Sequence, residues 1–404
     1  MGENSIKSSL RFEVGVAPIA ERLAGSVDFS QLHDMWDDER HCYKLGEGPA
    51  EGEIFLDEVN YHFEISEIDL TGEEGGKRIL TEIIADTSAE PDIVVPVFGG
   101  FGETSAQFEG NFLECQLRAL MLKGYKNPKI LGVNCSGRGS AEYMGNQENI
   151  ARYDLNYEFE DARLWAGYLD ENAYLGSDAE VLPMAHSMGC MDVIEFMDAL
   201  HSREDVAKVS SETRGRIKDV LHFMPAVDVP FACLRPKFVS AVIVEAPSAL
   251  AQAISGKGGL AYSPKRYAKA MLDPKSPDQQ LCDRGVADSA RKFLEFTLTF
   301  KRRFSDKLAS GGVNDGVRFH ILQAGQDHII PDGTADKWHD YLSGDGIGVE
   351  PQDVFVASRL NHSIPFSTMT SVQRQQMMKF LEISLPVKKE EVASSVIFRK
   401  TIRQ

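Results

Sequence analysis

One serine of the sequence stands in a pattern that suits nucleophilic chemistry. Residues 185–189 read Ala-His-Ser-Met-Gly, a variant of the Gly-x-Ser-x-Gly motif centred on Ser187. In this motif the serine occupies a strained strand-to-helix turn, and the residues two before and two after it must be small. Ala185 and Gly189 meet that condition. Ser187 is therefore the candidate nucleophile.

The surroundings of this pentapeptide carry more weight than the pentapeptide itself. A small-x-Ser-x-Gly string arises by chance roughly once in three chains of this length, given average residue usage. Residues 308–312 come close to the same pattern, but they follow a predicted helix and begin with leucine. Before Ser187, by contrast, residues 181–185 form an apolar run, and an amphipathic segment, 188–200, follows. This is the strand–turn–helix context that the motif requires.

A serine hydroxyl needs a base to take its proton, and the base needs a partner that orients it. His362 follows the predicted strand 353–357, and Asp327 follows the predicted strand 317–322. The chain order Ser, Asp, His is the one found with this motif. Loops at the carboxyl ends of parallel strands meet at one edge of a sheet, so we expect the three side chains to come together. We predict that His362 is the base for Ser187 and that Asp327 orients it.

Other residues could fill the same roles. Asp228, after the predicted strand 219–224, is an alternative acid. His328 directly follows the predicted acid, and His339 lies in a predicted helix, so both are weaker candidates for the base. His186 stands within the turn itself and is expected to be a packed or hydrogen-bonded neighbour.

An attacked carbonyl develops negative charge on its oxygen, which two backbone N–H groups can stabilise. One donor is expected from Met188, directly after the nucleophile. The other is expected from Phe101, in the glycine-rich loop that follows the predicted strand 93–98.

The elements that must position these residues alternate along the chain. Such alternation with short links predicts a mostly parallel sheet covered by helices on both faces. An antiparallel hairpin, 59–65 with 79–85, precedes it. The predicted strands of the parallel part are 93–98, 129–134, 181–185, 219–224, 317–322 and 353–357, and the predicted helices are 105–123, 160–169, 188–200, 334–342 and 371–383.

The alternation stops over residues 229–312, which we interpret as a helical cap inserted above the sheet. The sequence thus divides into an N-terminal extension (1–58), the first part of an α/β core (59–228), the cap (229–312), the second part of the core (313–386) and a C-terminal tail (387–404).

These motifs together resemble the α/β-hydrolase superfamily, and within it the esterase and monoacylglycerol-lipase-like serine hydrolases. The resemblance covers roughly residues 59–383 and rests on the stretch 98–102, the turn 136–139, the pentapeptide at 185–189, the loop 325–331 and Asn361-His362. It implies an α/β-hydrolase sheet with a cap, a catalytic triad of Ser187, Asp327 and His362, and an oxyanion hole formed by Phe101 and Met188.

The sequence departs from this family in three places. Gly99-Gly100 precedes the expected oxyanion donor where the family often has His-Gly, and Ala185 and Cys190 stand where glycine is frequent. The changes leave the three triad residues intact but weaken an assignment to one subfamily.

Composition narrows the class of partners. The 404 residues are 43% hydrophobic and 26% charged, which is typical of a globular protein. The formal net charge of -18 repels nucleic acids and anionic membrane surfaces, so neither is expected as a partner. Neither a secretory signal nor a bilayer-spanning stretch is recognised. Six cysteines without a paired spacing are expected to be reduced thiols in a cytoplasmic chain, neither disulfides nor metal ligands.

We therefore expect a serine hydrolase that cleaves a carboxylic ester through an acyl-enzyme on Ser187, with a small-molecule ester as partner and neither metal nor organic cofactor. The apolar residues of the cap favour a substrate with an acyl chain. An acyltransferase would use the same triad, and a non-catalytic binding protein could share the fold. A dehalogenase is disfavoured because it needs a carboxylate at position 187.

Overall fold

The computed structural model describes most of the expected core. Its described residues are 11–13, 27–37, 42–71, 76–100, 110–135, 140, 155–201, 211–226, 304, 313, 316–327, 330, 333–343, 353–360, 362 and 369–388. Phe101, Asp228, His328, the C-terminal tail from residue 389 and all of the expected cap except Phe304 lie outside them.

Twelve strands of the described residues form one sheet, in the order β1-β14-β13-β12-β11-β8-β9-β7-β6-β5-β2, with β10 also paired to β8. Its parallel part runs from β1 to β9. The members of that part are β1 (Arg11–Glu13), β14 (Asp353–Ala357), β13 (Arg318–Ala324), β12 (Asp219–Phe223), β11 (Met184–His186), β8 (Ile93–Phe98), β10 (Glu180–Val181) and β9 (Pro128–Val133).

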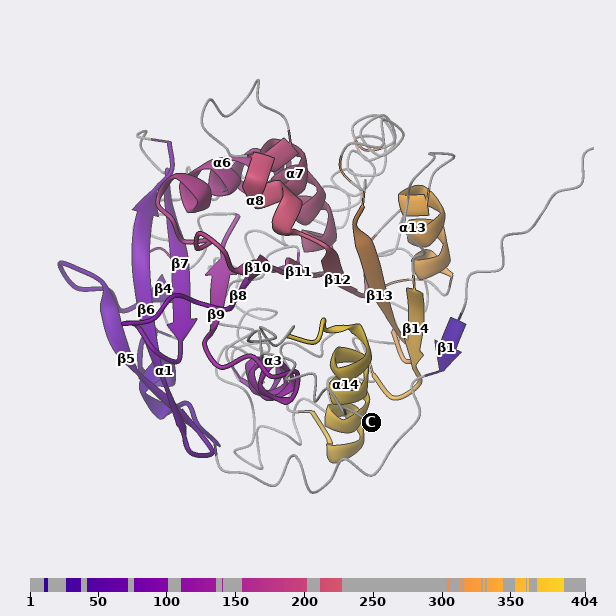
Figure 1. Ribbon diagram of the computed structural model, residues 1–404, viewed down its shortest axis with the longest axis horizontal. Helices are drawn as coiled ribbons and strands as arrows, with labels where there is room; N and C mark the ends of the chain where they lie inside the picture. The colour runs from indigo at the N-terminus through magenta and orange to yellow at the C-terminus, as the bar shows by residue number, and fades with distance from the viewer. Residues whose placement is uncertain are drawn as a thin grey trace, which may run out of the picture.

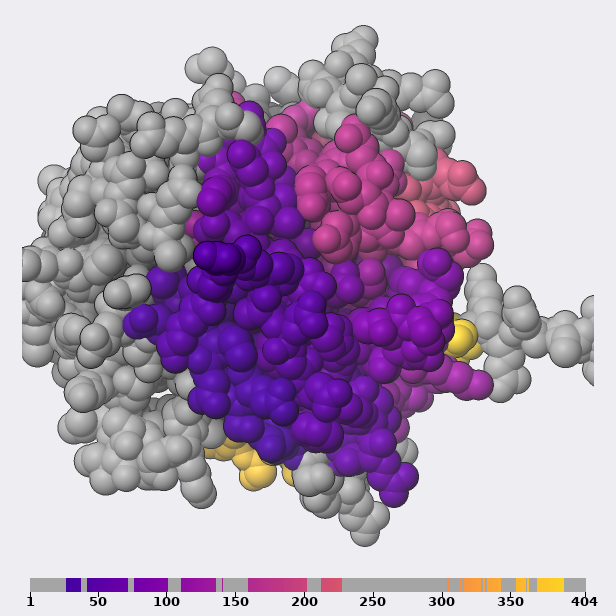
Figure 2. Space-filling view, turned by 90° about the vertical axis from the view of Figure 1, so that its left-hand side faces the viewer, coloured from indigo at the N-terminus to yellow at the C-terminus, as the bar shows by residue number. Residues whose placement is uncertain are grey.

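The remaining strands are antiparallel and come from the N-terminal part of the chain. They are β7 (Lys77–Ile84), β6 (Val59–Asp69), β5 (Ala50–Leu56) and β2 (Val27–Asp28), while β3 (Trp36–Asp37) and β4 (Cys42–Tyr43) pair separately. Figure 2 shows the indigo and violet residues of this part gathered on one side of the molecule.

The burial pattern of a strand agrees with its place in the sheet. All residues of β8 are buried, as expected for a central parallel strand covered on both faces. In β6 the buried residues Tyr61, Phe63 and Ile65 alternate with more exposed ones, so only one face of this strand meets the core. The predicted hairpin is confirmed, because β6 and β7 are antiparallel neighbours.

Helices cover both faces of the sheet (Figure 1). On one face lie α3 (Asn111–Leu122) and α14 (Ser371–Ser384), and on the other lie α6 (Leu155–Glu171), α7 (Gly189–His201), α8 (Ser211–Arg216) and α13 (Thr334–Ser343). The short α1 (Ser30–Asp34) lies beside β5. Each face has its own hydrophobic core: Phe112 and Phe380 belong to the first, Trp165, Ile194 and Trp338 to the second.

The predicted fold class is confirmed: the sheet is mostly parallel, has an antiparallel N-terminal part and carries helices on both faces, as in the α/β-hydrolase fold. Two details differ from the sequence prediction. The expected strand 181–185 is divided into β10 and β11, because Pro183 lies between them and has no N–H for a ladder bond. Strands β1, β2 and β5 from the expected extension 1–58 pair into the same sheet.

In the part of the chain that the structure describes, no helix has both the length and the apolar character needed to cross a membrane.

Candidate active site

Ser187 occupies a sharp turn between β11 and α7. Its φ of +53° lies in the left-handed region, which residues with a side chain rarely adopt. Two backbone hydrogen bonds stabilise the turn: Ser187 N donates to Phe223 O at 2.9 Å, and Ala226 N donates to Ser187 O at 3.1 Å. The strained backbone is therefore held by the end of the neighbouring strand β12.

The close approach of β8 explains why the flanking residues are small. A Cβ atom at Gly189 would lie 2.2 Å from Gly99 O and 2.7 Å from Phe98 O, so a side chain cannot fit unless the backbone moves. Ala185 on the other side of Ser187 is buried within β11. Gly189 thus faces a crowded backbone, and Ala185 is enclosed in the core.

The structure brings the three predicted triad residues together. His362 Nε2 lies 3.1 Å from Ser187 Oγ, and His362 Nδ1 lies 2.9 Å from Asp327 Oδ2. An imidazole that donates its Nδ1–H to the carboxylate presents the lone pair of Nε2 to the hydroxyl. The arrangement can therefore draw a proton from Ser187 and stabilise the resulting imidazolium.

Asp327 and His362 are held by loops that lie against each other. Gly325 N, in the loop after β13, donates to Ala357 O at 2.8 Å. A Cβ atom at Gly325 would lie 2.7 Å from the Cα of Ser358, so the two loops can approach this closely only because residue 325 is glycine. The contact holds the loop that carries Asp327 against the end of β14, from which the chain leads to His362.

Burial strengthens the electrostatic interactions of this set. The side chains of Asp327 and His362 are only 3% and 7% exposed, and Ser187 is 7% exposed. Inside a protein, charges and dipoles interact more strongly than in water. The second oxygen of the carboxylate is also bonded, because Ile330 N donates to Asp327 Oδ1 at 2.7 Å. Both oxygens of the buried carboxylate therefore have a hydrogen-bond partner.

The other histidines named from the sequence take different places. His186 is buried beside the set, and its Nε2 lies 3.0 Å from the backbone oxygen of His362. His339 lies in α13, where its Nδ1 is 3.7 Å from Asp340. Met188 immediately precedes α7, and the first N–H groups of a helix have no carbonyl partner within it. Its amide can therefore donate to an oxygen held above Ser187.

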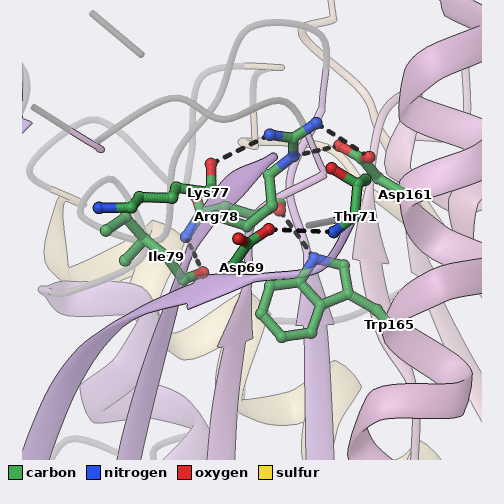
Figure 3. Close-up of polar contacts among 8 residues, drawn as sticks. Asp69, Thr71, Lys77, Arg78, Ile79, Asp161 and Trp165 are labelled. Atoms are coloured by element: carbon green, nitrogen blue, oxygen red, sulfur yellow. Dashed lines mark hydrogen bonds and ion pairs between the residues drawn. The ribbon is translucent and has the colours of Figure 1, made fainter. Parts of the chain in front are cut away.

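A buried polar network lies at the carboxyl edge of the parallel strands, where β9 ends and β7 begins (Figure 3). Arg78 at the start of β7 binds Asp161 of α6 through two hydrogen bonds, Nε to Oδ2 at 2.5 Å and Nη2 to Oδ1 at 3.0 Å. Trp165 Nε1, one turn later in α6, donates to Asn134 O at 2.8 Å. Asn134 Nδ2 donates to Ile79 O at 2.9 Å.

This network joins β7, the end of β9 and α6. The predicted turn 136–139 lies outside the described residues. Burial raises the pKa of the Asp161 carboxyl to about 6, although the Arg78 guanidinium acts in the opposite direction. Sequence reasoning missed the pair, since the two residues are 83 positions apart and neither belongs to a motif.

One more histidine is buried in the core beneath this edge. His222 of β12 is fully buried, and Trp338 Nε1 of α13 donates to its Nδ1 at 2.7 Å. Burial lowers the pKa of His222 to about 3, so its ring is neutral at ordinary pH.

Among the described residues, His, Cys, Asp and Glu side chains nowhere gather in a group of three that could hold a metal ion. The four described cysteines are buried: Cys42, Cys115, Cys135 and Cys190.

Several solved structures are similar to this chain. A thermostable esterase from Pseudomonas putida has 12% sequence identity and a TM-score of 0.43 over 85% of each chain. Brefeldin A esterase, a bacterial homologue of human hormone-sensitive lipase, has 13% identity and a TM-score of 0.43 over 86% of this chain and 78% of the esterase. Carboxyl esterase 2 of Tuber melanosporum has 12% identity and a TM-score of 0.40, over 86% and 91%. No protein-family model and no curated protein sequence matches this chain.

Proposed function

We propose that this chain is a serine hydrolase that cleaves a carboxylic ester through an acyl-enzyme on Ser187. The proposal rests on two contacts of the His362 ring. Its Nε2 lies 3.1 Å from Ser187 Oγ, and its Nδ1 lies 2.9 Å from Asp327 Oδ2. The left-handed backbone of Ser187 supports it, because this strain presents the hydroxyl at the strand-to-helix turn.

In the first half of the proposed reaction, His362 Nε2 takes the proton of Ser187 while Oγ forms a bond to the ester carbonyl carbon. The carbonyl oxygen becomes an oxyanion and accepts hydrogen bonds from the N–H of Met188 and, as the sequence predicts, of Phe101. The bond to the alkoxy oxygen then breaks, and the proton on His362 passes to the departing alcohol. The acyl group remains on Ser187.

In the second half, water replaces the alcohol. His362 takes a proton from the water, whose oxygen attacks the acyl carbon, and the bond to Ser187 Oγ breaks as Oγ regains the proton. Asp327 stays ionised throughout and stabilises the imidazolium in both halves. The proposed chemistry thus uses only residues of this chain, an ester and water.

Covalent labelling tests this proposal directly. A fluorophosphonate should phosphonylate Ser187 of the full-length protein, and a p-nitrophenyl ester should be hydrolysed. Ser187→Ala should abolish labelling and lower turnover by several orders of magnitude, since only binding and the oxyanion donors would remain. The control is Ser384→Ala, which removes a buried hydroxyl at the last residue of α14 and should leave both unchanged.

Labelling of the Ser187→Ala protein at the rate of the unmodified chain would refute the assignment of the nucleophile. Transfer of the acyl group to an added alcohol or thiol in preference to water would replace the hydrolase by an acyltransferase with the same residues.

A further inference from the structure

His186 makes a contact that the reaction described above does not use. It is the last residue of β11 and directly precedes Ser187. Its Nε2 lies 3.0 Å from the backbone carbonyl oxygen of His362, a residue 176 positions away. The two imidazole rings are 4.7 Å apart between centroids and tilted by 47°, and His186 is fully buried.

The acceptor determines where the proton of His186 lies. A carbonyl oxygen can only accept a hydrogen bond, so His186 Nε2 must carry a hydrogen. A ring with its proton on Nδ1 alone would turn a lone pair towards the carbonyl oxygen inside the core, which is unfavourable. The contact is therefore a hydrogen bond donated by His186 to the main chain of His362.

This bond holds His362, the proposed base, through its main chain. The ring of His362 is held at its two nitrogens by Asp327 and Ser187. Its main-chain carbonyl is held by His186, whose own backbone continues directly into Ser187. The nucleophile and the backbone of its base are therefore linked through two consecutive residues of one turn.

We propose that His186 is a positioning residue for the reaction at Ser187: it holds the main chain of His362 so that Nε2 stays within reach of Oγ. The inference rests on the proposed function for its catalytic meaning. Errors of about 1 Å in the placement of reacting groups can cost about a hundredfold in rate. Loss of the bond should thus lower the rate of the chemical step more than it weakens substrate binding.

Two substitutions separate positioning from simple core packing. His186→Phe keeps a flat ring in the same place but has no donor, whereas His186→Gln loses the ring but keeps a side-chain N–H of similar reach. We expect kcat for a p-nitrophenyl ester to fall about ten- to a hundredfold in the Phe variant with KM little changed. In the Gln variant we expect kcat within about threefold of the unmodified chain. Packing alone predicts the reverse order, because Phe is closer to His in shape.

A spectroscopic measurement tests the inference without reference to activity. The proton that His362 Nδ1 shares with Asp327 should give a downfield proton NMR signal, assigned by its loss in Asp327→Ala. It should persist in His186→Gln and broaden or shift in His186→Phe. Thermal unfolding of both variants shows whether each one is folded.

The outcomes distinguish the two proposals. If the unmodified chain neither labels with fluorophosphonate nor hydrolyses esters, the proposed function fails, while the NMR signal still decides the role of His186. An unchanged signal and unchanged kcat in a folded His186→Phe variant would overturn the inference. If the Phe variant does not fold, the Gln variant decides: a folded His186→Gln protein as slow as Ser187→Ala would also overturn it.

Discussion

Asp327 Oδ2 lies 2.9 Å from His362 Nδ1, and Asp327 Oδ1 accepts the backbone N–H of Ile330 at 2.7 Å. This division of the two oxygens determines what an amide would do in the same place. The oxygen of an asparagine would have to remain on Ile330, because an N–H there would face another N–H. Its amide nitrogen would then face His362.

For this reason Asp327→Asn should keep the fold and lose activity. The amide N–H would make Nδ1 of His362 an acceptor, which places the proton on Nε2 and removes the lone pair that Ser187 needs. By analogy with serine proteases, turnover should fall on the order of 10⁴-fold. The measurement is kcat for a p-nitrophenyl ester, with Asp340→Asn as a control because that side chain is 82% exposed. Asp228→Asn should cost far less, and the reverse ranking would move the acid to residue 228.

The turn at Ser187 predicts a steric effect at Gly189. Gly189→Ala would place a methyl group 2.2 Å from Gly99 O, so the end of β8 and the start of α7 must move apart. We expect a loss of about 1–3 kcal/mol in the free energy of unfolding, together with slower fluorophosphonate labelling. The matched control is Gly215→Ala in α8, where the new methyl group meets nothing within 4 Å. This variant should be as stable as the unmodified chain or slightly more stable, because alanine favours helix over glycine. Equal stability of the two variants would contradict the prediction.

Buried His222 should make the free energy of unfolding depend on pH. Its pKa in the folded state is lowered to about 3 from 6.5, so the unfolded chain binds the extra proton between these values. The free energy of unfolding should therefore be highest above pH 6.5 and fall as the pH drops towards 3, by about 1.4 kcal/mol per pH unit from this group.

Denaturant unfolding at several pH values checks this dependence. His222→Gln keeps an acceptor for Trp338 but does not titrate, so its curve should be flatter than that of the unmodified chain over this range. His201→Gln at the exposed end of α7 serves as the control. Parallel curves for the unmodified chain and His222→Gln would contradict the prediction.

The expected cap gives a prediction about substrate size. If residues 229–312 form the far wall of the pocket, Phe293→Ala, Phe296→Ala and Phe300→Ala should change the preference among two-, four- and eight-carbon acyl esters. Each buried methylene contributes about 0.8 kcal/mol, roughly fourfold in binding. The competing expectation is that these rings only pack helices together, as Phe304 does where it packs edge-on against Phe159 of the core helix α6. An equal loss of kcat/KM on all three esters, or a loss of thermal stability alone, would favour packing.

Much of the sheet could be predicted from the sequence because buried parallel strands are apolar at every position. Strand β8 is the clearest case, since each of its residues is buried. Ser187, Asp327 and His362 could be selected because each lies in the turn or loop that follows a predicted strand. Parallel strands bring their carboxyl ends to one edge, so sequence order sufficed to place the three residues together.

Contacts set by tertiary structure could not be predicted in this way. Strand β2 has two residues, too few to show a period of two, and its place in the sheet follows from its pairing with β5. The pairing of Arg78 with Asp161 depends on how α6 packs beside β7. His186 could be recognised as a neighbour of Ser187, but its bond to the carbonyl of His362 depends on where the chain returns after β14.

The pairing of β1 with β14 constrains the order in which the protein can assemble. Arg11 lies opposite Val354, so β1 is synthesised long before its partner strand. Closing so long a loop is slow and entropically costly, and it must await the synthesis of β14. The sheet from β9 to β14 can form first, with an open edge along β14 until β1 is added. In the nascent protein this edge is the place where another chain could add a strand by mistake.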